Sequence, residues 1–256
     1  MTTSTRTAAT LDQAVDNQAD RVAAFAQRAG RPHLIDDDLV VGWMADRGMF
    51  SNQAIVRRPP ESAEAWKEVV DRVASAVPAH APVLVVSPYA PADPLGALGF
   101  VHVGEPPLMV RPAGVATGAP APSGLIVTEV VDEVGLEVFE RTLVDGYPAP
   151  DLQPYEPRCM LTPELLGGAT RFWLGMLDGR PVATAWSHTA HGVNGVEAVA
   201  TLAGDRGAGH GYAVTWAATT ADPTLPSILY ASDLGRPVYE RMGYEVVRRW
   251  SLWLRK

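Results

Sequence analysis

Residues 201–212 read TLAGDRGAGHGY, and this stretch decides how the second half of the chain folds. It follows an apolar, β-branched run and precedes a helical pattern from about residue 211 to 220, so we predict a strand, a tight turn and a helix. Gly207, Gly209 and Gly211 remove Cβ atoms where the backbone must approach another group closely. The N-terminus of the next helix would offer unpaired N–H groups to an anion. On the glycines alone, a turn that merely permits a tight bend is an equal alternative.

The spacing narrows the kind of anion. A triphosphate-binding loop needs a Lys-Ser or Lys-Thr pair at the start of the helix, and here that place holds His210, Gly211 and Tyr212. A dinucleotide fingerprint needs G-x-G-x-x-G in an early βαβ unit, whereas this chain has G-x-G-x-G late in its sequence. The sequence therefore argues against both of these nucleotide sites.

The surrounding pattern predicts a mixed α/β fold with an antiparallel meander ahead of the glycine turn. Hairpin turns are expected at Asp178-Gly179 and at Asn194-Gly195. The elements expected in this half are a strand at 125–131, a helix at 133–144, strands at 172–177, 181–188 and 196–202, a helix at 211–220, a strand at 228–231, a short helix at 236–242 and a last strand from Tyr244.

A segment rich in Pro, Gly and Ala predicts a boundary between two lobes, which we place at 1–113 and 124–256 with a linker at 114–123. Helices at 11–29 and after Pro60 and strands at 83–87 and 108–111 are expected in the first lobe. Similarly spaced Leu98-Gly99-Phe100 and Met242-Gly243-Tyr244 indicate an internal duplication.

The glycine turn resembles the acetyl-CoA motif R/Q-x-x-G-x-G/A of the GCN5-related N-acetyltransferases, with Arg206, Gly209 and Gly211 at its defining positions. Residues 231–244 resemble the C-terminal segment of that family, where a short helix carries a Tyr and a Gly-aromatic pair starts a strand. The resemblance covers about 125–256 and implies the family's fold there, in tandem with a degenerate lobe. In that first lobe the corresponding stretch AIVRRPPES has no glycine and two prolines that lack N–H donors.

The resemblance also implies which residues hold acetyl-CoA. Backbone N–H groups of the turn would hold the pyrophosphate, and those around Val199 to Thr201 would bind the oxyanion and the pantetheine arm. The expected coenzyme residues are Val199, Ala200, Thr201, Arg206, Gly207, Ala208, Gly209, His210, Gly211 and Tyr212.

Two side chains are candidates for the chemistry. The resemblance implies that Tyr239 is the acid for the leaving thiolate, and a tyrosine simply packed on the sheet is the alternative. Glu197 is the only carboxylate of its strand, and strict alternation would place it on the same face as Val199 and Thr201, which makes it a candidate base. A solvated Glu197, with a water chain serving as the base, is equally consistent with the sequence.

Composition limits the remaining classes of function. The net charge of −8 argues against a broad nucleic-acid surface and weakly favours a small cationic amine over a protein amino group as acceptor. No apolar run approaches the roughly 20 residues that cross a bilayer, and the N-terminus has no signal-like apolar region, so a cytoplasmic protein is expected. A homodimer is left open.

We expect no metal and no disulfide. Cys159 is the single cysteine, the run Asp36 to Asp38 is expected to be solvated, and His188 and His191 lie three apart. The leading hypothesis is an N-acetyltransferase acting by direct attack in a ternary complex. A non-catalytic acyl-CoA-binding module and a purely structural protein are the alternatives.

Overall fold

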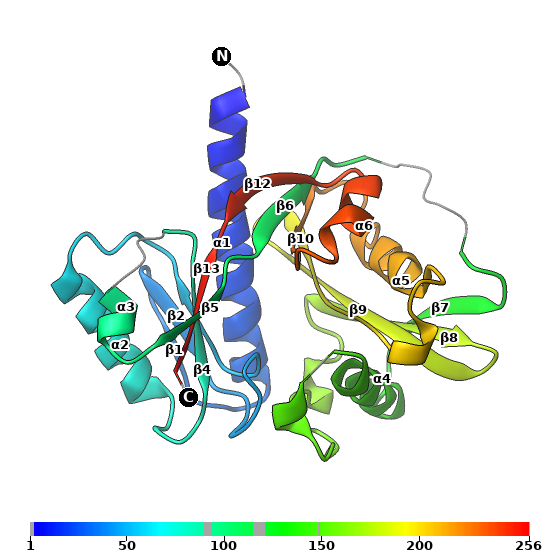
Figure 1. Cartoon of the computed structure of the whole chain (residues 1–256), viewed down its shortest axis with the longest axis horizontal. Helices are drawn as coiled ribbons and strands as arrows, with labels where there is room; N and C mark the ends of the chain where they lie inside the picture. Colours follow the sequence, from blue (N-terminus) through cyan, green and yellow to red (C-terminus); the bar gives the residue numbers. More distant parts are fainter. Residues whose placement is uncertain (1–2, 90–93, 115–120, 148, 256) are drawn as a thin grey trace. The chain divides into compact units, whose positions relative to one another are not determined.

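A computed structural model describes residues 3–89, 94–114, 121–147 and 149–255 (Figure 1). The chain forms two compact units, one of Met1–Leu108 with Val247–Lys256 and the other of Met109–Val246. These units differ from the expected lobes mainly in the last ten residues, which join the first unit. Part of the expected linker, residues 115–120, lies outside the described residues.

The first unit is a six-stranded mixed sheet with a helix packed on each face. On one face, α1 approaches so closely that a Cβ at Gly42 would lie 2.8 Å from Cγ1 of Val22. On the other face, α2 buries Trp66 and Val73 against the sheet. The sheet order is β1-β2-β3-β4-β13-β5, and the elements are α1 (Thr3–Arg28), β1 (His33–Ile35), β2 (Leu39–Gly42), β3 (Gln53–Val56), α2 (Ala63–Ala76), β4 (Val83–Ser87), α3 (Pro94–Ala97), β5 (Val101–Gly104) and β13 (Ser251–Arg255).

The second unit is built on a seven-stranded sheet in which α5 and α6 cover one face and α4 the other (Figure 1). The sheet order is β12-β6-β11-β10-β9-β8-β7, and the strands are β6 (Pro107–Arg111), β7 (Leu125–Val130), β8 (Thr170–Leu177), β9 (Arg180–Ala190), β10 (Val193–Thr201), β11 (Ser227–Tyr230) and β12 (Glu245–Arg249). The helices are α4 (Glu133–Gly146), α5 (His210–Thr219), α6 (Arg236–Arg241) and the short 3-10 turns η1 (Pro150–Leu152), η2 (Pro163–Leu165) and η3 (Ala203–Asp205).

The antiparallel meander is confirmed, although one of its two predicted turns was wrong. β8, β9 and β10 pair antiparallel, and Asp178 and Gly179 form the first turn with φ values of 50° and 79°. The second turn is at His191, not at Asn194-Gly195. Asn194 is a fully buried strand residue whose side-chain amide donates to the Ala218 carbonyl at 2.8 Å, which fastens β10 to the end of α5.

Two strands lie in the sheet opposite to the one that the sequence suggested. β6 was expected to close the first lobe, but it lies between β11 and β12 in the second unit's sheet. β13 follows the second unit in the sequence but lies between β4 and β5, where Trp253 pairs with Val85 and packs in the first unit's core. Each sheet therefore contains one strand, β6 or β13, that the sequence order assigned to the other sheet, and no local sequence pattern indicates this.

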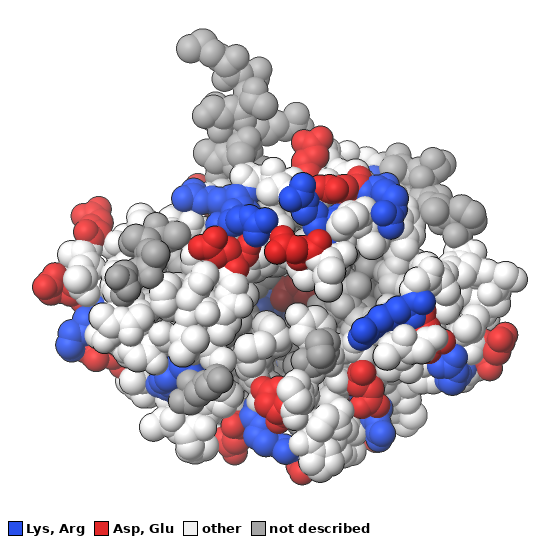
Figure 2. Space-filling model, viewed as in Figure 1, with Lys and Arg blue, Asp and Glu red and all other residues white. Residues whose placement is uncertain are grey.

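Surface charge is mixed rather than segregated on the face shown in Figure 2, where acidic and basic side chains lie interspersed. Within the described ranges, no helix combines the length and apolarity needed to span a bilayer, α1 included.

Candidate functional site

The central opening of the second sheet begins where β10 and β11 stop pairing. Within these two fully described strands, the parallel ladder runs from Asn194–Ser227 to Val196–Leu229, although β10 continues to Thr201. The register of β10 against β9 shifts between Glu197 and Ala200, and Ala198 has a φ of 52°. This β-bulge bends β10 and turns its last residues away from β11. Backbone groups on that edge are therefore available to an extended ligand.

The bulge also changes the face on which Glu197 lies. Glu197 pairs with Trp186, whose ring contacts Phe139 of α4, so Glu197 shares the α4 face. Val199 instead packs with the core under α5, and Thr201 Oγ1 lies beside Gly211 of that helix. The prediction that Glu197 shares a face with Val199 and Thr201 was wrong, because an inserted residue breaks the alternation.

The glycine turn after β10 leaves the N-terminus of α5 without a side-chain cap. Gly209 is the N-cap with a φ of 86°, and Gly207 has a φ of 81°, a conformation that favours glycine. The first helical bond of α5 runs from the Ala213 N–H to the Gly209 carbonyl, so the N–H groups of 210–212 have no acceptor within the helix. By contrast, α2 and α4 are capped by the Ser62 hydroxyl and the Asp132 carboxylate. The start of α5 can therefore receive an anion.

Close packing holds this turn against the end of β10. A Cβ at Gly211 would lie 2.8 Å from Thr201 Oγ1, so a larger residue would push strand and helix apart. On the other side of the strand, a Cβ at Gly146 would lie 3.2 Å from the Thr201 carbonyl carbon. Both helices that contact this strand end therefore carry a glycine at the point of closest approach.

Arg206 fixes the turn through two carbonyl oxygens. Its Nε donates to Thr201 at 3.1 Å and its Nη2 to Gly146 at 2.9 Å. The guanidinium thereby joins the turn to β10 and to the end of α4. This geometry indicates that Arg206 positions the turn rather than pointing away from it toward a phosphate.

A second arginine fixes the residue before Arg206. Arg180 binds both oxygens of Asp205, at 2.8 and 2.7 Å, and the Asp205 side chain is largely covered. The hydrogen bonds from Arg180 lower the pKa of Asp205. The carboxylate is therefore committed to the turn's own structure.

His210 is a buried member of the turn. Its side chain is only 4% exposed, and Nδ1 has no hydrogen-bond partner in the described part of the chain. Ala208, between the two left-handed glycines, is exposed. The structure therefore gathers all the predicted turn residues at the start of α5 and beside the end of β10.

Tyr239 lies on α6, half-buried at the edge of the core that α5 covers. Its ring meets that of Tyr244 edge-on at 6.3 Å. Burial, and secondarily the neighbouring Tyr147, raises the pKa of Tyr239 to about 12, so the phenol stays protonated at neutral pH. Within the described residues its hydroxyl makes no hydrogen bond, which leaves it able to donate to a ligand.

Tyr147 was not predicted from the sequence. It caps α4, directly after the Gly146 that contacts β10, and burial raises its pKa. Its charge is the second cause, after burial, of the raised pKa of Tyr239. No motif marks it, because its position depends on how the end of α4 meets the strand.

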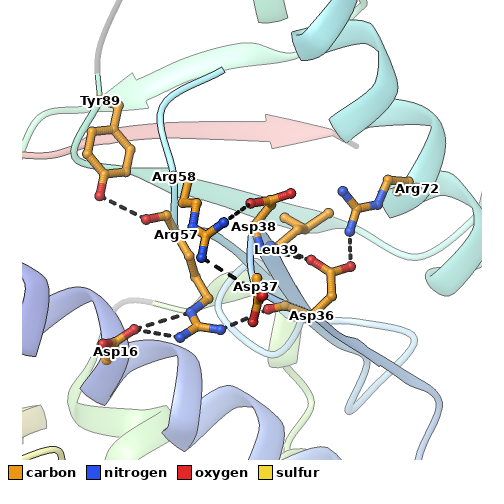
Figure 3. Close-up of polar contacts among 9 residues, drawn as sticks. All are labelled: Asp16, Asp36, Asp37, Asp38, Leu39, Arg57, Arg58, Arg72 and Tyr89. Atoms are coloured by element: carbon orange, nitrogen blue, oxygen red, sulfur yellow. Dashed lines mark hydrogen bonds and ion pairs between the residues drawn. The ribbon is translucent and has the colours of Figure 1, made fainter. Parts of the chain in front are cut away.

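The remaining candidates have structural roles. The carboxylates of Asp36, Asp37 and Asp38 pair with Arg72 and Arg58, while Arg57 joins Asp16 and the Asp36 carbonyl (Figure 3). His188 is a buried strand residue 2.8 Å from Thr170 Oγ1. No cluster of His, Cys, Asp and Glu suited to a metal occurs among the residues that the structure describes.

Cys159 is poorly suited to nucleophilic chemistry. Burial, followed by the charge of Glu140, raises the pKa of its thiol to about 12. Glu140 is itself almost fully buried and accepts N–H groups of Arg158, Met160 and Leu161 at 2.6 to 2.7 Å. The carboxylate organises this loop and keeps the thiol protonated.

Comparison with known proteins identifies the fold. No family model and no curated protein matches the sequence. The structure is similar to a GCN5-related N-acetyltransferase from Kribbella flavida, with a TM-score of 0.63 and 23% identity over 90% of this chain and 93% of that one. It is also similar to a putative GNAT-family acetyltransferase from Novosphingobium aromaticivorans, with a TM-score of 0.56 and 18% identity over 91% and 95%. A functionally unknown protein from Staphylococcus epidermidis matches with a TM-score of 0.59 and 13% identity over 88% and 93%.

The chain is therefore a two-unit α/β protein with a splayed strand pair and an uncapped glycine turn. Its fold is that of the GCN5-related N-acetyltransferases, as the motifs at 201–212 and 231–244 predicted.

Proposed function

We propose that this chain is an N-acetyltransferase that moves an acetyl group from acetyl-CoA to a primary amine, by direct attack in a ternary complex. The observation that carries the proposal is the uncapped start of α5 at the end of a splayed strand. A diphosphate fits the start of α5, which has no side-chain cap and presents N–H groups without an acceptor in the helix, and the pantetheine arm fits the edge of β10 beyond its ladder with β11. The acceptor is a small cationic amine or a protein amino group, and the setting is cytoplasmic.

In the reaction, the neutral amine nitrogen attacks the thioester carbon, a C–N bond forms and the C–S bond breaks. The amine loses one proton, and the departing sulfur carries the negative charge until it is protonated. Backbone N–H groups near Val199 to Thr201 would stabilise the oxyanion. A lysine-like amine with a pKa near 10.4 must first lose its proton, which at neutral pH costs about 4 to 5 kcal/mol.

Tyr239 would act on the leaving sulfur. Its pKa of about 12 keeps the proton in place, but a thiol has an ordinary pKa of about 8.5, so complete transfer would run against a difference of about 3.5 pKa units. A hydrogen bond from the phenol to the developing thiolate avoids that cost. We therefore assign Tyr239 the role of donor to the sulfur, with water completing the protonation.

One observation supports a non-catalytic acyl-CoA-binding module as the second candidate. The bulge puts Glu197 on the α4 face, away from Val199 and Thr201, so β10 carries no carboxylate base on the face of those two residues. Glu197→Gln keeps the shape and removes the charge. A large loss of turnover with unchanged acetyl-CoA affinity would support Glu197 as base, and unchanged turnover would favour a water chain.

The test is calorimetric titration with acetyl-CoA, followed by detection of free thiol in the presence of a panel of amines. Gly209→Trp is the blocking variant. A tryptophan at this left-handed position would be strained, and its Cβ alone would already lie 3.3 Å from Cγ of Pro122. Binding that this variant loses, with amine-dependent thiol release by the native chain, would support the enzyme. Binding without thiol release for any amine would favour the binding module, and no binding would refute both.

A further inference from the structure

Two partly buried aromatic rings of α5 stack on one another. Tyr212 and Trp216 lie one helical turn apart, with ring centroids separated by 6.2 Å and planes inclined by only 9°. Both are half-buried at the edge of the core, whereas Val214 and Ala218 on the inner side of α5 are fully buried. The rings therefore remain partly accessible to a ligand.

The two ends of the stack differ: Arg111 lies over the Trp216 ring, and Tyr212 lies nearer the glycine turn. Tyr212 lies in the first turn of α5, and because helical side chains lean toward the N-terminus, its ring lies on the side of Trp216 that faces the glycine turn. At the other end, the Arg111 guanidinium lies 5.3 Å from the Trp216 ring. A further planar group would therefore join the stack at Tyr212.

Arg111 adds a positive charge to this region. It is 7% exposed, and its hydrogen bonds go to carbonyl oxygens, that of Met242 at 3.0 Å and those of Pro112 and Gly114 at 3.4 Å. No carboxylate pairs with it within the described ranges. A buried cation without a carboxylate partner favours an anionic ligand nearby.

We propose that Tyr212 is a platform on which the adenine base of the acyl donor stacks, one ribose away from the diphosphate at the start of α5. This inference rests on the proposed function, since it concerns another part of the same ligand. An adenine has a flat π face that stacks on an aromatic ring, and such stacking contributes roughly 1–3 kcal/mol per base in proteins that bind single-stranded nucleic acids, or about 5- to 150-fold in affinity. The stack then selects a nucleotide-bearing donor over one that ends at the phosphopantetheine.

The test compares two donors and two variants by calorimetry. Acetyl-CoA carries the adenosine, whereas S-acetyl-4′-phosphopantetheine has the same arm and one phosphate without it. Tyr212→Leu keeps an apolar side chain against the core but removes the ring, and Tyr212→Phe keeps the ring as the matched control. Thermal melting without ligand checks that both variants are folded.

We expect Tyr212→Leu to weaken acetyl-CoA binding about 5- to 150-fold while its affinity for the phosphopantetheine donor stays within about twofold of the native value. Tyr212→Phe should bind both donors as the native chain does. An equal loss for both donors would mean that Tyr212 only shapes the turn, and unchanged acetyl-CoA affinity in Tyr212→Leu would mean that the ring is not used. Either result overturns the platform while leaving the proposed function intact, whereas no acetyl-CoA binding by the native chain overturns both.

Discussion

Tyr239 and Leu95 occupy the same position in a helix-ending hydrogen-bond pattern that the two units share. The Tyr244 N–H bonds the Tyr239 carbonyl at 3.1 Å, and the Phe100 N–H bonds the Leu95 carbonyl at 3.0 Å. In each case a glycine with a φ near 90°, Gly243 or Gly99, precedes the buried aromatic residue. The duplication expected from these residues is therefore matched in local structure, and the first unit has no hydroxyl where the second has its candidate donor.

Tyr239→Phe should lower kcat by about 10- to 100-fold and leave the dissociation constant for acetyl-CoA unchanged, because the phenol stabilises the sulfur only as the C–S bond breaks. Steady-state kinetics and calorimetry on the same preparation separate the two effects. Tyr89→Phe is the matched control, since the Tyr89 hydroxyl donates to the Arg57 carbonyl in the first unit. A native kcat in Tyr239→Phe would contradict the assignment.

The rate should increase with pH and show no decline in the mildly alkaline range. At subsaturating amine, kcat/KM should rise about tenfold per pH unit toward the pKa of the amine, near 10.4 for a lysine-like acceptor, because only the neutral form attacks. Tyr239, with its pKa of about 12, keeps its proton throughout this range. A bell-shaped profile falling above about pH 9 would show that another acid is required.

Gly211→Ala should weaken acetyl-CoA binding, and a second substitution should restore it. The added Cβ would lie 2.8 Å from Thr201 Oγ1 and would separate α5 from the end of β10. We expect a loss of about tenfold in affinity, of the size that small misplacements of a binding group produce. Thr201→Ala removes the opposing oxygen, so the double variant should regain most of the affinity. A double variant as weak as Gly211→Ala would show that the close approach to Thr201 is not the cause.

Arg206→Ala should destabilise the chain even without coenzyme. It removes hydrogen bonds to the Thr201 and Gly146 carbonyls, each contributing about 1 kcal/mol or more, and the melting temperature should fall by several degrees. Arg236→Ala is the control, because its pairing with Glu240 on α6 is exposed. If Arg206→Ala weakened binding without changing the melting temperature, the arginine would act on the phosphate directly.

Acetyl-CoA should bind with one equivalent per chain. In the first unit, the segment between β3 and α2 contains Pro59 and Pro60, and the Ser62 hydroxyl caps the helix that would otherwise face an anion. Calorimetric stoichiometry checks this directly. Ser62→Ala should alter stability only, and two equivalents per chain would contradict the view that the first unit lost its site.

Local chemistry allowed part of this structure to be predicted. The glycine turn, the meander and the short helix carrying Tyr239 were recognisable because each depends on residues near one another in the sequence. The bulge at Ala198 was not, since nothing in the run from Val196 to Thr201 signals an extra residue. The turn at His191 was missed because Asn194 resembles a turn residue until its buried bond to Ala218 is seen.

The strand exchange was missed for a different reason. The residues of β6 and β13 specify strands, but the choice between two sheets depends on contacts far away along the chain, such as those of Trp253. The local sequence pattern therefore predicts that a segment is a strand, but not which strand it pairs with.

The place of β13 in the first sheet has a consequence for how the chain acquires its structure during synthesis. β4 and β5 leave the ribosome early, yet the strand that lies between them is made only after the whole second unit. Until β13 is made, β4 and β5 therefore lack the strand that lies between them, and their unpaired edges are of the kind that promote misassembly. The first sheet should thus be completed only after β13 has been synthesised.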